Sequence, residues 1–152
     1  MDTPRLLVVD DDRRITELVA KVAQEQGFVV HRIHRGTEFF EAYQTSNPHV
    51  VVMDIVMPDT DGFEILNHLF EQESDAQIVI MSGNPSYRPM AARMGGGFEL
   101  NVIANLAKPF RIANLRQILV LAKRAYDMKL LRPCPDDLAS AESHEEPNNV
   151  AS

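Results

Sequence analysis

The 152-residue sequence has little of several features that mark other classes of protein. It has one cysteine, Cys134, so no disulfide can form within the chain. No stretch approaches the ~20 consecutive apolar residues of a membrane-spanning helix, and the first residues lack the basic and apolar regions of a signal peptide. The net charge of −7 leaves no basic stripe of the kind that holds nucleic acid. We therefore expect a cytoplasmic protein that contacts no membrane and binds neither DNA nor RNA directly.

Short apolar runs alternate with segments in which apolar residues recur at helical spacing. The runs, read as strands, are residues 6–9, 28–33, 50–53, 77–81 and 102–107. Strict alternation of strands and helices predicts right-handed crossovers and a parallel sheet that is covered on both faces. Five strands in ~125 residues fit an α/β fold, the flavodoxin-like (βα)₅ doubly wound sheet with strand order 2-1-3-4-5.

Capping residues predict where the helices begin. Asp12, Thr37 and Asp61 are suitable N-caps for the first three helices, because their side-chain oxygens can accept from free backbone amides. Residues 87–94 form a short fourth helix, and the last helix runs from about Arg111 to at least Tyr126.

The composition changes near Leu131, which predicts two regions. Residues 1–131 form one domain, and residues 132–152 form an acidic polar tail or linker with five acidic residues and one basic residue. Such a segment holds too few apolar residues to build a core.

The last helix carries two apolar stripes, where a helix on a sheet needs one. The first comprises Ile112, Leu115, Leu119, Ala122 and Tyr126, and the second comprises Ile118, Leu121, Ala125 and Met128. The second stripe predicts a partner, packing by the tail or a homodimer through this helix. The alternative is one broad core face.

Polar residues follow the predicted strands at the point where each strand ends. They are Asp10, Asp11, Asp54, Ser82 and Lys108. Because the carboxyl ends of parallel strands meet at one edge of a sheet, we expect these side chains to converge. Three carboxylates in close proximity repel one another, and Mg²⁺, which prefers oxygen ligands, would relieve that repulsion.

This set of groups suits phosphoryl transfer to a carboxylate. Asp54, at the tip of the most apolar strand, would be an exposed nucleophile and would form an aspartyl phosphate. The metal and Lys108 would neutralise the phosphoryl charge, and the Ser82 hydroxyl would donate to a phosphoryl oxygen. Two alternatives stay open: the Asp10–Asp12 triplet merely caps the first helix, or Asp11 and Asp12 form the metal pair.

Four motifs in order, LLVVDDD, VVVMDIVMPDTDG, MSG and AKPF, resemble those of bacterial two-component response-regulator receiver domains. The resemblance covers roughly residues 5–125. It implies that Asp54 is the phospho-acceptor and that Mg²⁺ is held by Asp11 directly, by Asp10 through water and by the backbone carbonyl of Val56.

The resemblance also implies the remaining roles. Ser82 would be the switch hydroxyl, Lys108 would pair with the phosphoryl group, and Pro109 would follow a cis peptide bond. The phosphoryl donor would be a phosphohistidine on a sensor histidine kinase or a phosphotransfer protein. The output would be protein–protein interaction with an unknown downstream protein or a fused output domain. Catalysis would be limited to self-phosphorylation and self-dephosphorylation at Asp54, so the chain is not expected to be an enzyme in the ordinary sense.

The sequence departs from the family pattern at two places. Asn105 stands where the family usually has Tyr or Phe, so the aromatic part of the switch is either missing or replaced. The stretch between Ser82 and Lys108 is a few residues longer than usual and contains Gly95–Gly97. This longer version is similar to receivers attached to EAL-type cyclic-di-GMP phosphodiesterase domains.

Two other functions remain as alternatives. The DTDG motif, Asp59 to Gly62, is similar to the nucleophile loop of haloacid-dehalogenase-type phosphatases, with Asp59 as the nucleophile. Two features argue against Asp59 as the nucleophile: the strand ends at Asp54, and Pro58 lies between the strand and Asp59. A receiver-like interaction module that no longer signals is the second alternative, indicated only by Asn105.

Overall fold

A computed structural model describes residues 3–83 and 100–131 of the chain. All its strands lie in one parallel sheet of order β2-β1-β3-β4-β5, as the alternation of strands and helices predicts. The strands are β1 (Arg5–Val9), β2 (Val29–Ile33), β3 (Val50–Asp54), β4 (Gln77–Ser82) and β5 (Asn101–Ala107). The helices are α1 (Arg13–Glu25), the 3₁₀ helix η1 (Gly36–Glu38), α2 (Phe39–Ser46), α3 (Gly62–Glu71) and α5 (Ile112–Leu131).

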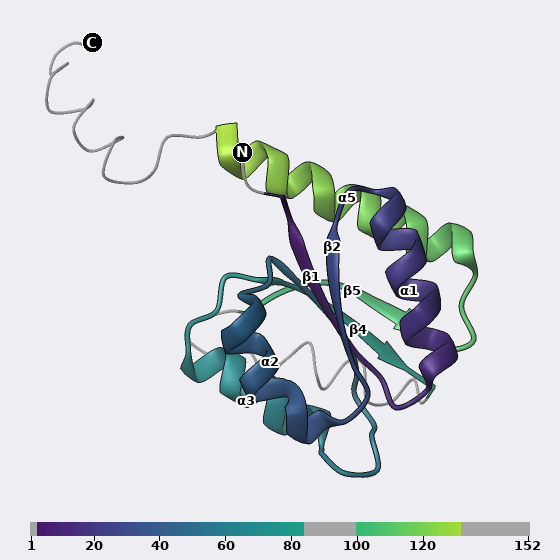
Figure 1. The fold of residues 1–152 in the computed structure, drawn as a ribbon, viewed down its shortest axis with the longest axis vertical. Coiled ribbons are helices and arrows are strands. Elements are labelled where there is room, and N and C mark those ends of the chain that lie inside the picture. The colour runs from purple at the N-terminus through teal and green to yellow at the C-terminus, as the bar shows by residue number, and fades with distance from the viewer. Residues whose placement is uncertain (1–2, 84–99, 132–152) are drawn as a thin grey trace, which may run out of the picture.

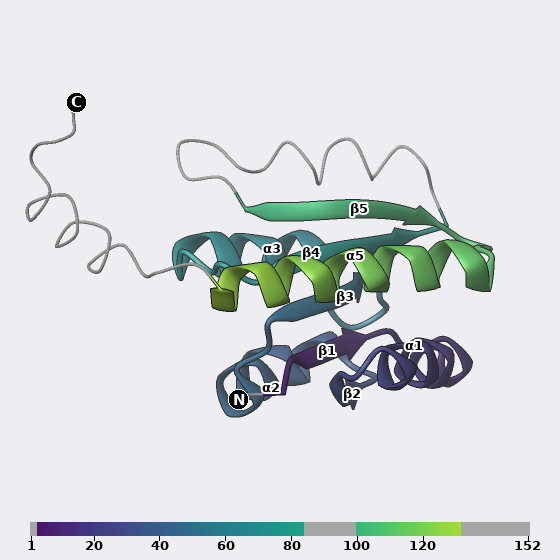
Figure 2. The same ribbon diagram turned by 90° about the horizontal axis from the view of Figure 1, so that it is seen from above.

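The helices cover the two faces of the sheet, with α1 and α5 on one face and α2 and α3 on the other (Figures 1 and 2). Successive side chains of a strand point to opposite faces. In β1, Leu7 and Val9 therefore join the core under α2 and α3, whereas Leu6 and Val8 join the core under α1 and α5. The central strand β3 is buried along its whole length. Two cores thus hold the sheet rigid, and its carboxyl edge remains for polar groups.

Two of the three predicted N-caps are confirmed. Asp12 accepts a hydrogen bond from the amide of Arg14 at the start of α1, and Asp61 accepts one from Phe63 at the start of α3. The prediction for Thr37 is wrong, because this residue lies inside η1, and Glu38 precedes α2 without a side-chain cap. The predicted helix at 87–94 lies outside the described residues.

The two apolar stripes of α5 differ in burial. In the first stripe, the side chains that face the sheet are buried, namely Leu115, Leu119, Ala122 and Tyr126. In the second, Leu121 is 53% exposed and Met128 is 56% exposed, although Ile118 packs partly against the core. The alternative of one broad core face is therefore wrong for most of the second stripe, which leaves an apolar surface on α5.

Within residues 3–83 and 100–131, none of the helices combines the length and the apolar character needed to cross a membrane.

Two leucines on the same helix test this packing. Truncating Leu119, which is fully buried, removes core contacts and leaves a cavity, so Leu119→Ala should lower the free energy of unfolding by about 2–5 kcal/mol. Leu121→Ala should change it by about 0.5 kcal/mol or less, because this side chain is half exposed. Urea unfolding of the two variants measures the difference. Equal losses would contradict the assignment of the core face.

Candidate functional site

A lysine from the far end of the chain lies between two carboxylates at the carboxyl edge of the sheet. Lys108 Nζ is 2.6 Å from Asp10 Oδ2 and 2.8 Å from Asp54 Oδ2. Asp10 follows β1, Asp54 ends β3, and Lys108 follows β5. These strands bring together residues 98 and 54 positions apart in the sequence. The predicted convergence of these three side chains is therefore confirmed.

A third carboxylate completes an acidic group. Oxygens of Asp10, Asp11 and Asp54 all lie within 4.8 Å of one another, with Asp10 and Asp54 buried and Asp11 exposed. Three carboxylates and one ammonium leave a formal charge of two negative units, which a divalent cation would balance. Oxygen ligands from an exposed and two buried carboxylates suit Mg²⁺, which keeps several of its waters when bound. The residues present therefore fit a magnesium site.

The ion pairs and burial act in opposite directions on this group. Burial raises the pKa of Asp10 to about 6 and outweighs the hydrogen bond and charge of Lys108. For Lys108, burial favours the neutral amine, but the hydrogen bonds and charges of Asp10 and Asp54 outweigh burial and raise the pKa. Lys108 therefore stays charged at neutral pH. Ionisation of Asp10 is disfavoured by its burial, and a bound cation would offset that cost.

Asp12 does not belong to the acidic group. Its side chain caps α1, and hydrogen bonds from Arg14 lower its pKa. Its backbone amide donates to Asp10 Oδ1 at 2.9 Å and thereby orients that carboxylate. The structure thus favours Asp10 and Asp11 over the alternative pair Asp11 and Asp12.

Asp54 is more enclosed than a strand tip suggests. The residue is 6% exposed, whereas the sequence predicts an exposed acid. Its Oδ1 accepts from the amide of Val56 at 3.0 Å, and its Oδ2 accepts from Lys108. Both oxygens are therefore held in place. The loop that follows folds back on itself, so that Val56 pairs with Asp61.

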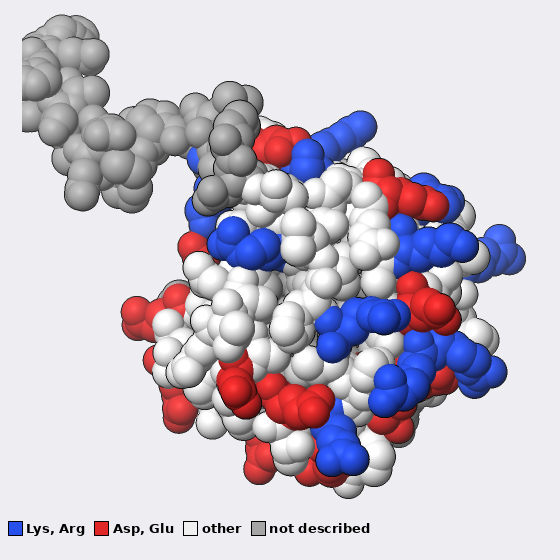
Figure 3. Space-filling view, in the orientation of Figure 1, with Lys and Arg blue, Asp and Glu red and all other residues white. Residues whose placement is uncertain are grey.

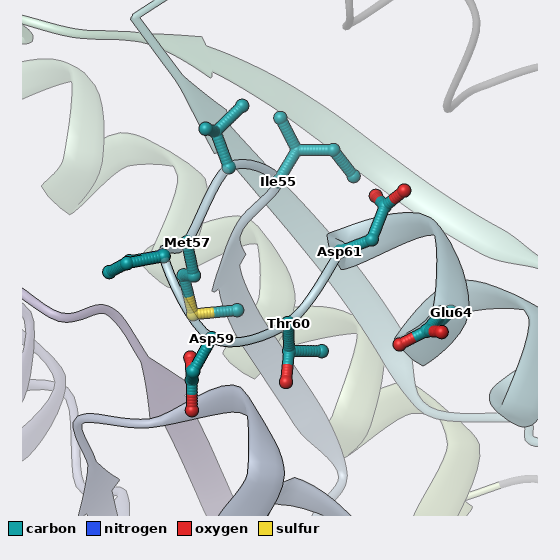
Figure 4. Close-up of a pocket in the computed structure, with 8 residues that line it drawn as sticks. Ile55, Met57, Asp59, Thr60, Asp61 and Glu64 are labelled. Atoms are coloured by element: carbon teal, nitrogen blue, oxygen red, sulfur yellow. The ribbon is translucent and has the colours of Figure 1, made fainter.

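That loop also lines a hollow beside the site (Figure 4). The hollow has a volume of about 440 Å³ and is lined by Ile55, Val56, Met57, Pro58, Asp59, Thr60, Asp61 and Glu64. Val56 is half exposed at its rim, two residues after Asp54. The loop thus connects the acidic group directly to the surface.

Ser82 and Lys108 are neighbours through the backbone. Ser82 is buried at the end of β4, and its carbonyl oxygen accepts from the amide of Lys108 at 2.9 Å. The peptide bond between Lys108 and Pro109 is cis, as the resemblance implies. Asn105 is exposed on β5, beside Ile80 in the register. Gly95–Gly97 lie outside the described residues, so the similarity to EAL-associated receivers stays a prediction.

Asp59 takes no part in the acidic group. Its carboxylate accepts hydrogen bonds from the amides of Gly36 and Thr37 and from the Thr37 hydroxyl, at 3.2–3.3 Å. Figure 4 shows this side chain directed at the neighbouring segment, away from Asp61. Sequence reasoning did not foresee this contact and read Asp59 only as an alternative nucleophile.

A doubly wound parallel sheet with three carboxylates and a lysine at its carboxyl edge defines a class of phosphoryl-accepting signalling domain. A family model described as the response regulator receiver domain matches residues 6–120. This chain belongs to that family.

Known proteins agree with this assignment. The chain is 31% identical over 111 residues to the response regulator MprA of Mycobacterium ulcerans, a match that covers 73% of this chain and 46% of the relative. The chain thus spans less than half the length of such relatives. The receiver domain of the Francisella response regulator 1452 matches with a TM-score of 0.67 and 26% identity, over 81% of this chain and 98% of that one. Thermotoga maritima TrrA, solved with Mg²⁺ and BeF, matches with a TM-score of 0.66 and 25% identity, over 78% and 98%.

The raised pKa of Asp10 predicts how stability depends on pH. Without metal, the folded protein holds a proton on Asp10 up to about pH 6, whereas the unfolded chain releases it near 3.8. The contribution of Asp10 to stability is therefore present below about pH 4 and is lost as the pH rises to about 6. Asp10→Asn removes the ionisable group and therefore this pH-dependent loss of stability. Urea unfolding in EDTA should show a steeper decline for the wild type than for the variant, and parallel curves would contradict it.

Proposed function

We propose that this chain is the Mg²⁺-dependent phosphoryl-accepting receiver of a two-component pathway, with Asp54 as the acceptor. One observation carries the proposal: Asp54 ends the central strand within reach of the Lys108 ammonium and of two further carboxylates. A lone buried acid would be a poor nucleophile, but a fixed carboxylate beside a cation can attack a phosphoryl group. Membership of the receiver family supports the same assignment.

The residues of the site divide the chemistry. One oxygen of Asp54 attacks phosphorus, the new O–P bond forms, and the bond from phosphorus to the donor nitrogen breaks, with its electron pair leaving on the imidazole. Lys108 then shifts from pairing with carboxylates to pairing with the phosphoryl oxygens, and Ser82 donates its hydroxyl to one of them. Asp10, Asp11, Asp54 and the Val56 carbonyl would hold Mg²⁺, which supplies positive charge beside the phosphoryl oxygens. Hydrolysis of the aspartyl phosphate at the same site returns the chain to its starting state.

The partners follow from this chemistry. The donor would be a sensor histidine kinase or a phosphotransfer protein, since a phosphohistidine supplies the phosphoryl group. The output would be an unknown downstream protein or a fused output domain. With one cysteine in the chain, we assign the reaction to the cytoplasm.

Surface charge supports a protein partner over nucleic acid. No Lys or Arg occurs from Gly36 to Gly83. Figure 3 shows acidic side chains at the lower left, over α2 and α3, and basic side chains mixed with acidic ones on the right. Nucleic-acid binding uses a continuous basic patch, which this face does not present.

The switch would work through Ser82. A phosphoryl group on Asp54 draws the Ser82 hydroxyl towards it, and the segment after β4 follows. With Asn105 in place of a ring, we expect the rearrangement in the glycine-rich stretch at 95–97, which lies outside the described residues, because glycine is conformationally permissive.

Loss of the acceptor tests the proposal directly. Wild type with Mg²⁺ and acetyl phosphate should gain one phosphoryl group by intact-protein mass spectrometry and should bind beryllofluoride in fluorine NMR. Asp54→Asn should do neither, because the amide is no nucleophile. Asp75→Asn, a matched change in an exposed acid just before β4, should behave as wild type.

An Asp54→Asn variant that reacts as well as wild type would place the chemistry elsewhere. A wild type that binds neither Mg²⁺ nor beryllofluoride would favour an interaction module that no longer signals.

The exposed stripe of α5 supports a homodimer as one form of output. Leu121 and Met128 are both more than half exposed, which is unusual for large apolar residues on one helix. If the stripe pairs two copies, Leu121→Ala should weaken self-association of the beryllofluoride-bound protein about tenfold or more in sedimentation equilibrium, since one well-buried leucine contributes that much to a small interface. A monomeric wild type would rule this interface out.

A further inference from the structure

The loop between β3 and α3, residues 55–61, is fastened at its tip to a different part of the chain. Asp59 Oδ1 accepts from the amide of Gly36 at 3.2 Å, and Asp59 Oδ2 accepts from the amide and the hydroxyl of Thr37. These hydrogen bonds outweigh the desolvation of Asp59 and lower its pKa, so the carboxylate is ionised at neutral pH. A charged acceptor makes such hydrogen bonds stronger than neutral ones.

Close packing accompanies the hydrogen bonds. Gly36 lies against Thr60, and a Cβ built on Gly36 would overlap the Thr60 side chain. Met57, in the middle of the loop, is 7% exposed and belongs to the core under α2 and α3. The loop is therefore held from one side by Met57 and from the other by the first residues of η1.

The segment that holds the loop tip is itself tied to the acidic group. Ile33, at the end of β2, accepts from the amide of Asp10 at 3.3 Å through its carbonyl. Gly36 and Thr37 follow Ile33 closely in the chain. Asp59 thus links the loop after Asp54 to the backbone that borders Asp10.

The base of the loop serves Asp54. The amide of Val56 donates to Asp54 Oδ1, and the amide of Gly62 donates to the carbonyl of Ile55 at 3.0 Å. A Cβ on Gly62 would meet the backbone of Ile55, so the base closes tightly. Movement at the tip would therefore be passed to Val56 rather than absorbed in the loop.

We propose that Asp59 is a positioning residue for the acceptor site: by joining the loop tip to Gly36 and Thr37, it fixes the backbone of Val56 against Asp54 and the metal. This inference rests on the proposed function, because it assigns the loop a task at that site. Asp59 lies outside the acidic group of Asp10, Asp11 and Asp54, so its effect would pass through Val56.

Mg²⁺ affinity of the full chain, measured by calorimetry, tests the proposal. Asp59→Ala should weaken Mg²⁺ binding about threefold to tenfold, somewhat less than the loss of a group that contacts a metal ligand directly. It should also shift the amide NMR resonance of Val56. Asp59→Asn retains one acceptor oxygen, so its Mg²⁺ affinity and its Val56 resonance should lie between those of the wild type and Asp59→Ala. Thr37→Val removes one donor and should reproduce a fraction of the loss.

Glu64→Gln is the matched control, because Glu64 lines the same hollow and its replacement removes the same charge. If Asp59→Ala and Glu64→Gln weaken Mg²⁺ binding equally, the effect is long-range electrostatics and the positioning role is wrong. A lower melting temperature for Asp59→Ala with unchanged Mg²⁺ affinity and an unchanged Val56 resonance would also overturn it. Failure of the wild type to bind Mg²⁺ would instead defeat the proposed function itself.

Discussion

The bridge that Lys108 makes between Asp10 and Asp54 is the interaction on which the site depends. Two buried carboxylates at one sheet edge would repel each other, and water is too scarce there to screen them. The ammonium pairs with one oxygen of each, while backbone amides of Asp12 and Val56 donate to the other. The acidic group is therefore preorganised, which is the condition under which electrostatic stabilisation accelerates a reaction.

Much of the fold could be predicted because its signals are local. β-branched runs such as Val50 to Val52 indicate buried parallel strands, and alternation with helices then limits the topology. The convergence of Asp10, Asp54 and Lys108 follows from topology alone, since parallel strands share one carboxyl edge. Asp12 and Asp61 cap helices as their spacing indicates. These predictions needed no knowledge of how side chains pack. The chemical roles of the site residues remain predictions, namely those assigned to Asp10, Asp11, Asp54, Val56, Ser82 and Lys108.

What sequence reasoning missed depends on contacts between separate loops. The burial of Asp54 accompanies contacts from the following loop and from Lys108, which no periodicity describes. Thr37 is a residue type that often caps helices, but its hydroxyl donates a hydrogen bond to Asp59 instead. Asp59 itself lies in a motif that suggested a nucleophile, although its oxygens are taken up by Gly36 and Thr37. In each case a tertiary contact overrode a local preference, and its only sequence signal is a polar residue in a turn.

The late position of Lys108 in the sequence determines when the acidic group can be completed during synthesis. During synthesis the acids emerge first, and the stretch from Gly36 to Gly83 offers no lysine or arginine to neutralise them. Lys108, the basic residue that pairs with Asp10 and Asp54, is synthesised only after β5, 98 residues after Asp10. A nascent or truncated chain that lacks β5 would carry the acceptor carboxylate but not the charge arrangement around it. The bridge between Asp10 and Asp54 therefore forms only once β5 has joined the sheet, in a nearly complete domain.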